Sequence, residues 1–248
     1  MSGHSKWAKI KRQKGANDAN KGAIFTKLAR EIQVAAREGG PDPAGNSRLR
    51  LAIQKARDGN MPAANIQRAI EKAIGGAGEQ LEEITYEGYG PGGAAILIQT
   101  MTDNRNRTVG DVRAAFSRAG GSMGEAGSVA WQFELRGVIA LNPSGRDPDE
   151  IALVAIDAGA EDVKTDDGTV EIFTPFEGLE PVRAALEGQG LSIDHAEATM
   201  LPKTTVELDD EQATQVLKLI DRLEDLDDVQ RVYTNVEFSE AVMQAVGG

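Results

Sequence analysis

The residues best suited to binding chemistry stand at the start of the chain, where cations are dense. Five basic residues and one indole fall within nine positions: Lys6, Trp7, Lys9, Lys11, Arg12 and Lys14. Lys21, Lys27 and Arg30 continue the positive charge into the next segment. Lysine and arginine neutralise phosphates, and an indole stacks on a base or wedges against a sugar. A solubilising tail is the alternative, but a tail needs neither this charge density nor an aromatic residue. We therefore interpret this basic arm, residues 1–17, as a polyanion-binding segment.

A second group of polar side chains follows a short joint between two expected helices. The joint Asp58–Met61 has about the length of a helix-turn-helix turn, and the helix after it carries Asn65, Gln67, Arg68 and Lys72. Asn, Gln and Arg side chains read base edges in a major groove. Glycine joints also connect ordinary packed helices, which is the more frequent case. The sequence leaves a base-reading helix and an ordinary packed helix both open.

A third group lies between an expected strand and an expected helix, in the run Thr102–Thr108. Asn104, Arg105 and Arg107 make this run rich in side-chain donors within an otherwise acidic region. One explanation is an elaborate cap at the N-terminus of the helix. The other is a second contact with a polyanion. The residue types favour neither.

A glycine-rich run and a histidine are two further candidates for a functional site, but neither has the context that such a site needs. The glycine-rich run Gly88–Gly93 leads into a strand, whereas a dinucleotide fingerprint leads from a strand into a helix. Pro91 also removes a backbone donor that a phosphate loop would use. We expect a tight turn there. His195 falls in an expected strand without a recognisable partner motif, so we expect a structural role.

Acidic residues form three clusters that are better explained by helix ends and surface than by catalysis. The clusters around Asp147 and Asp209 precede expected helices, where acids favour the positive end of the helix dipole. The cluster Glu224–Asp228 ends a helix and is expected to be a solvated surface. No nucleophile–base pair or convergent metal ligands stand out. We expect no catalytic residues, no metal, no cofactor and no enzymatic activity.

Composition excludes several classes of protein. The 248 residues include 27 Lys+Arg against 39 Asp+Glu, for a net charge of −12, yet residues 1–80 alone carry +8. There is no cysteine and there are two histidines, which excludes disulfides, thiolate metal sites and a multi-histidine site within one chain. The longest apolar run is six residues, far short of the roughly 18 that span a membrane. We expect a cytoplasmic protein without a membrane partner.

Apolar spacing predicts an N-terminal helical bundle followed by α/β segments. Helices are expected over 20–38, 46–58 and from 60 to 75, with a further helix at 107–119 between strands at 94–102 and 128–135. From residue 137 the expected elements begin with a strand at 137–142 and follow the βαββαβ order of a ferredoxin-like unit. The fold class is therefore α+β: a helical bundle, then two α/β ferredoxin-like domains, one inserted into the other. The expected domains are 1–78, 79–135 plus 203–248, and the insertion 136–202.

The chain resembles the YebC/PmpR family along essentially its whole length. The motifs that carry the resemblance are Met1–Trp7, Phe25–Leu28, Gly40–Pro43, Asn60–Pro62, Asn65–Ile66, Tyr86–Pro91, Thr102–Arg107 and Gly120–Met123. The resemblance implies a three-domain fold with a helical N-terminal domain and no catalytic activity. Members are commonly described as DNA-binding transcriptional regulators. The mitochondrial translational activator of cytochrome c oxidase and some bacterial members resemble ribosome-associated translation factors.

Two functional hypotheses follow. The first is a DNA-binding transcriptional regulatory protein that acts through the basic arm and the helical domain. The alternative is a translation factor that contacts ribosomal RNA on the ribosome, because basic groups on separate domains suit a folded RNA surface. A third possibility, a metal-dependent nuclease, needs converging carboxylates that sequence cannot reveal. Nucleic acid is the expected partner, and the oligomeric state is open.

Overall fold

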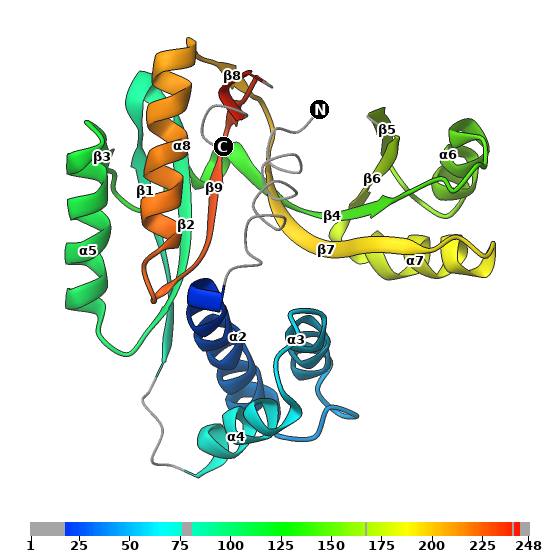
Figure 1. The fold of residues 1–248 in the computed structure, drawn as a ribbon, viewed down its shortest axis with the longest axis horizontal. Helices are drawn as coiled ribbons and strands as arrows, with labels where there is room; N and C mark the ends of the chain where they lie inside the picture. The colour runs from blue at the N-terminus through cyan, green and yellow to red at the C-terminus, as the bar shows by residue number, and fades with distance from the viewer. Residues whose placement is uncertain (1–17, 76–80, 167, 240, 244–248) are drawn as a thin grey trace. The chain divides into compact units, whose positions relative to one another are not determined.

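The computed structural model describes residues 18–75, 81–166, 168–239 and 241–243 (Figure 1). The chain is a mixed α/β protein whose two four-stranded sheets are antiparallel. Its contacts separate into two compact units, one spanning Trp131–Thr205 and the other formed by the described residues on either side of that segment. Within the described ranges, no helix combines the length and apolar character needed to cross a membrane.

The first three helices of the described residues form a small bundle with its own core. They are α2 (Asp18–Gly39), α3 (Ser47–Asp58) and α4 (Ala63–Ile74). Ile32 and Leu49 are fully buried where α2 meets α3. Asn46 connects the two helices: its side chain caps α3 by accepting from the Leu49 N–H and donates to the carbonyls of Ala35 and Gly40. These helices confirm the periodicity read from the sequence.

The joint between α3 and α4 is short and well defined. Asn60 has a φ of 59°, in the left-handed region that Asn tolerates better than most residues. The Met61 N–H donates to the Ala56 carbonyl at 2.9 Å, and Met61 is buried in the core of the bundle. The joint therefore fixes where α4 begins and which of its faces is buried.

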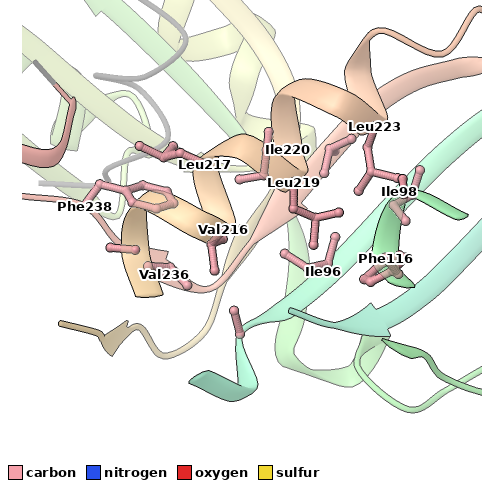
Figure 2. Packing of buried hydrophobic residues seen from close by; sticks show 14 of the residues in the cluster. Ile96, Ile98, Phe116, Val216, Leu217, Leu219, Ile220, Leu223, Val236 and Phe238 are labelled. Carbon is pink, nitrogen blue, oxygen red and sulfur yellow. The ribbon is translucent and has the colours of Figure 1, made fainter. Parts of the chain in front are cut away.

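A four-stranded sheet follows in the same unit. Its strands are ordered β3-β1-β2-β9, with β1 at Glu82–Tyr89, β2 at Ala95–Thr102, β3 at Ser122–Met123 and β9 at Val229–Thr234. Helices α5 (Arg105–Arg118) and α8 (Asp210–Glu224) pack on this sheet. Figure 2 shows Leu219 of α8 close to Ile96 of β2 in the shared core. The short strands β8 (Val206–Glu207) and β10 (Val236–Glu237) pair in parallel.

The glycine-rich run forms the turn between β1 and β2, as its position before a strand predicted. A single 3₁₀ turn spans Pro91–Gly93, and Gly92 and Gly93 have φ values of 67° and 78°. A Cβ on Gly92 would lie 2.6 Å from Leu208 Cδ2, so this position needs glycine for space as well as for conformation. The run shapes a turn rather than a strand-to-helix phosphate loop.

The unit Trp131–Thr205 has the βαββαβ order that the sequence predicted. Its elements are β4 (Phe133–Leu141), α6 (Pro148–Asp157), β5 (Asp162–Asp166), β6 (Thr169–Pro175), α7 (Leu179–Gly188) and β7 (Ile193–Pro202). The strands are ordered β5-β6-β4-β7 and neighbouring strands are antiparallel. Ile139 and Ile172 on the central strands pack with Leu186 of α7. His195 lies on β7, with Nε2 3.0 Å from a Glu197 carboxylate oxygen.

The prediction of two strands, at 128–135 and 137–142, is wrong at their junction. A 3₁₀ turn occupies Ala130–Gln132, and β4 continues through Gly137 without a break. We took Gly137 as the boundary between these two strands. A Cβ on Gly137 would lie 2.2 Å from Thr174 Oγ1 and 2.9 Å from Leu179 Cβ. This glycine thus permits close packing inside the strand.

The buried carboxylate of Glu87 binds the backbone of the segment that leads into the 3₁₀ turn Ala130–Gln132. Glu87 on β1 is 6% exposed and accepts from the backbone N–H groups of Gly127, Val129 and Ala130, at 2.6, 2.7 and 2.8 Å. Burial by itself raises the pKa of Glu87, but these three donors outweigh it and hold the pKa below its ordinary value. The charged form of Glu87 is therefore part of the folded structure.

We expect Glu87→Gln to lower the free energy of unfolding by about 1–3 kcal/mol at neutral pH, because an amide cannot satisfy all three donors. The folded-state pKa lies below the unfolded-state value. The stabilisation is therefore present above the unfolded-state pKa and is lost as the pH falls through the folded-state pKa. Urea unfolding at a series of pH values checks this, with exposed Glu125→Gln as the matched control. A stability difference that stays constant on acidification contradicts this account of Glu87.

Candidate nucleic-acid interface

The outer face of α4 presents polar side chains to solvent. Ile66, Ala69, Ile70 and Ala73 are buried in the bundle, which leaves Gln67, Arg68 and Lys72 exposed on the other side of the helix. Gln67 Nε2 donates to Glu71 at 3.0 Å, and Arg68 donates to Asn65 at 3.3 Å. Both hydrogen bonds stay within the helix and are exposed, so an approaching ligand can replace them.

The cations of α3 are mostly occupied by neighbours in the chain. Arg48 pairs with Glu38 and Glu83, Lys55 pairs with Glu31, and Arg50 donates to the Pro43 carbonyl. The remaining cation of this helix is Arg57, which is exposed. Among the described residues no side chain hydrogen-bonds or pairs with it. Arg57 therefore presents its charge on the same bundle as the outer face of α4.

Lys27 and Arg30, two of the cations expected to contact a polyanion, are engaged inside the chain. Lys27 on α2 donates to the Glu224 carbonyl, and Arg30 donates to the Asp227 carbonyl. Arg30 also lies 2.9 Å from Asp228 Oδ1, and its side chain is only 15% exposed. These contacts attach α2 to the end of α8, so the charges of Lys27 and Arg30 are partly satisfied before any ligand binds.

The run Thr102–Thr108 forms a helix cap. Asn104 is the N-cap of α5, and its side chain accepts from the Arg107 N–H at 3.0 Å. The side chain of Arg107 bonds to Asp103 and to Asp228. Arg105 is exposed. The capping explanation is thus confirmed for Asn104, while polyanion contact by Asn104, Arg105 and Arg107 stays a prediction.

Asp228 is the centre of this arrangement. Its side chain is 6% exposed and lies 2.8 Å from Arg107 Nη2 and 2.7 Å from Thr108 Oγ1. Burial raises the pKa of Asp228, but the bonds from Thr108 and Arg107 and the charge of Arg30 together lower it below the ordinary value. Our expectation that Glu224–Asp228 is a solvated surface is wrong for Asp228, because two arginines converge on it.

A polar hollow of about 570 Å³ opens beside this network. Its charged lining consists of five aspartates and two arginines: Arg30, Asp103, Arg107, Asp111, Asp225, Asp227 and Asp228. Because carboxylates outnumber cations and both arginines are already paired, the hollow repels a phosphate rather than binding it. In the described ranges, no set of three or more His, Asp or Glu side chains is arranged to hold a metal ion.

The basic arm lies outside the described residues. It contains six of the residues expected to bind nucleic acid: Lys6, Trp7, Lys9, Lys11, Arg12 and Lys14. Lys21 falls within α2, and its side chain is also outside the description. The contribution of these seven residues stays a prediction, whereas the positions of Gln67, Arg68 and Arg105 on the surface are observed.

Two family models match almost the whole chain. The model described as the TACO1/YebC protein N-terminal domain matches residues 5–76, and the model described as the TACO1/YebC second and third domain matches residues 81–236. The chain belongs to the TACO1/YebC family. The resemblance seen in the sequence motifs is thereby confirmed.

TACO1/YebC relatives align over their full length. A probable transcriptional regulatory protein of Dehalococcoides mccartyi is 58% identical over 98% of both chains. A protein of the same name from Herpetosiphon aurantiacus is 53% identical, also over 98% of both chains. The crystal structure of a conserved hypothetical protein from Aquifex aeolicus superposes with a TM-score of 0.80 at 46% identity, covering 90% of this chain and 93% of that one.

Sequence reasoning missed two residues of this TACO1/YebC chain that shape the candidate interface, Asp228 and Arg57. Asp228 is separated by 121 positions from Arg107, so no local pattern pointed to the pair. The sequence shows Arg57 as a cation in the last turn of the second helix. A cation in that position also stabilises the helix dipole, so its residue type alone does not indicate a ligand contact. Only the pairing of its neighbours with acids and a carbonyl distinguishes Arg57 from the other cations of α3.

Proposed function

We propose that the chain is a DNA-binding transcriptional regulator that contacts DNA through the basic arm and the helical bundle. The observation that carries this proposal is the outer face of α4, where Gln67 and Arg68 are exposed and bonded only within their own helix. Side chains of these types bond bidentately to adenine and guanine edges. Arg57 on α3 supplies a further cation for a phosphate.

The names of the relatives support a role in regulating gene expression and no catalytic step. Charge supports nucleic acid as the partner, because residues 1–80 carry +8 although the whole chain carries −12. We further propose that the helical bundle, the sheet with α5 and α8, and the βαββαβ segment are three domains, the last inserted into the second. Their three separate hydrophobic cores support this division.

A second candidate function is that of a ribosome-associated translation factor. The observation that favours it is the presence of exposed cations on two different elements, Arg68 on α4 and Arg105 at the start of α5. Folded RNA presents phosphates on several surfaces, whereas a straight duplex presents them along one axis. In this case the chain would contact ribosomal RNA with the same side chains.

Removing Gln67 and Arg68 tests the base-reading role of α4. We expect Gln67→Ala with Arg68→Ala to weaken binding to a DNA duplex selected from a random pool by about 1–3 kcal/mol per lost base contact, and to weaken binding to its scrambled counterpart much less. Fluorescence anisotropy on both duplexes measures the difference.

The matched control for this pair is Gln215→Ala with Arg222→Ala, which removes an exposed Gln and an exposed Arg from α8. Gln215 also bonds to a glutamate four residues earlier, as Gln67 bonds to one four residues later. An equal loss of affinity on the selected and scrambled duplexes would show that α4 contacts the backbone and reads no bases.

A further inference from the structure

Helix α5 carries an unusual charge for its surroundings. Residues 81–248 carry a net charge of −20, yet α5 contains four arginines and a single acid, Asp111. Arg107 is held by Asp103 and Asp228. Arg105, Arg113 and Arg118 are exposed, and among the described residues none of the three takes part in a hydrogen bond or ion pair through its side chain. Three arginines in an acidic region thus remain without a carboxylate partner there.

Two features of α5 oppose helix stability, and the fold does not explain either. Arg105 lies in the first turn, where the helix dipole disfavours a cation, and no acid is present in that turn. Gly110 lies in the middle of the helix, where glycine is less stable than alanine. A Cβ at Gly110 would meet no atom within 4 Å, so packing does not require the glycine. Departures from local stability of this kind are expected at functional surfaces.

A row of exposed residues lies on the side of α5 opposite the core. Thr108, Val112, Ala115 and Phe116 are buried in the core. At 3.6 residues per turn, the opposite side is a continuous row whose members are all exposed: Asn106, Gly110, Arg113 and Ser117. The row offers an amide, a guanidinium and a hydroxyl as donors, and it has no side chain at its centre. Arg105 lies in the first turn and Arg118 in the last turn, on opposite sides of the row rather than on it.

We infer that this row, flanked by Arg105 and Arg118, is a second surface that contacts the phosphodiester backbone of a nucleic acid. The inference rests on the proposed function and extends it to a part of the chain outside the basic arm and the helical bundle. Arginine, amide and hydroxyl donors match phosphate oxygens, and Gly110 lets the backbone of the ligand approach the helix closely. The contact is with phosphate and sugar, so it adds affinity without reading sequence.

The test neutralises the three unpaired arginines in the full chain as Arg105→Gln, Arg113→Gln and Arg118→Gln. The matched control, Arg146→Gln, Lys164→Gln and Arg183→Gln, removes the same charge from the unit Trp131–Thr205. The probes are a labelled DNA duplex and an RNA duplex of equal length, titrated over a series of salt concentrations. Each phosphate contact with B-DNA contributes about 0.9 to the slope of log affinity against log salt. On whichever duplex the wild-type chain binds, we expect the loss of three arginines to make this slope shallower by about 2–3. The control variant keeps the wild-type slope.

A second variant tests the close approach at Gly110 independently of charge. Gly110→Leu is expected to retain or raise the melting temperature, because leucine favours a helix, and to weaken binding severalfold. Unchanged affinity in Gly110→Leu, or equal slopes for the α5 and control variants, overturns the inference. If the wild-type chain binds neither duplex, the proposed function itself is wrong, and the inference that rests on it is wrong as well. If the wild-type chain binds but the α5 substitutions have no effect, only the inference about α5 fails.

Discussion

Replacing Lys9, Lys11 and Lys14 by glutamate is expected to lower the affinity of the full chain for duplex DNA by about a hundred- to a thousandfold near physiological salt. Each lost phosphate contact is worth roughly a factor of five to ten, so three lost contacts account for the expected loss. The five cations of the basic arm lie within nine positions, which is the highest density of positive charge in the sequence. No other short segment can replace these contacts.

The salt dependence of binding shows whether these three lysines act through phosphates. Removing three phosphate contacts should flatten the slope of log affinity against log salt by about 2.7. The matched control reverses three exposed lysines elsewhere in the chain, Lys164, Lys203 and Lys218. Circular dichroism checks that both variants fold. If the variant of the arm and the control lose affinity equally, net charge rather than the arm governs binding. If the wild-type chain sediments with ribosomes and ignores DNA, the translation-factor alternative is correct.

Replacing Asp228 by alanine is expected to lower the free energy of unfolding by about 3–5 kcal/mol, because the substitution leaves buried charge without its partner. Arg107 and Arg30 both converge on this carboxylate, and the hydroxyls of Thr102 and Thr108 lie 3.1 and 2.7 Å from it. The side chain of Arg30 is only 15% exposed, so water cannot fully replace Asp228. Urea unfolding followed by circular dichroism measures the loss.

Asp227→Ala is the matched control for this effect. Asp227 is exposed, and its contact with Arg30 uses the backbone carbonyl, which alanine retains. The control should therefore change the free energy of unfolding by less than about 0.5 kcal/mol. A double-mutant cycle between Asp228→Asn and Arg30→Met isolates their pairwise coupling. If Asp228→Ala is no more destabilising than the control, Asp228 does not attach α2 to the end of α8.

Local patterns in the sequence were enough to predict most of the helices and strands. Asn46 and Asn104 lie at helix starts and accept from N–H groups three positions later. The cap and the start of the helix therefore depend on the same few neighbouring residues. The βαββαβ order, predicted from residue 137 onward, followed from alternation and turn residues. Gly137 misled the prediction because the atoms that require it, on Thr174 and Leu179, lie about forty residues further along.

The candidate interface was less predictable because charge alone does not show which cations are already paired. Lys27, Arg30 and Arg107 have the same residue types as Arg57 and Arg68, yet the former three bond to groups at the end of α8. These partners are separated from them by more than a hundred positions. Only the folded chain distinguishes a cation that supports the structure from one exposed to a ligand.

The most direct test of DNA binding is the affinity of the full wild-type chain for a labelled DNA duplex, measured by anisotropy over a series of salt concentrations. Five phosphate contacts from the basic arm predict a slope of log affinity against log salt of about −4.5, and contacts from α4 or α5 make it steeper. Absence of binding at low salt, or a slope near zero, would contradict the proposal that this chain binds DNA through phosphates.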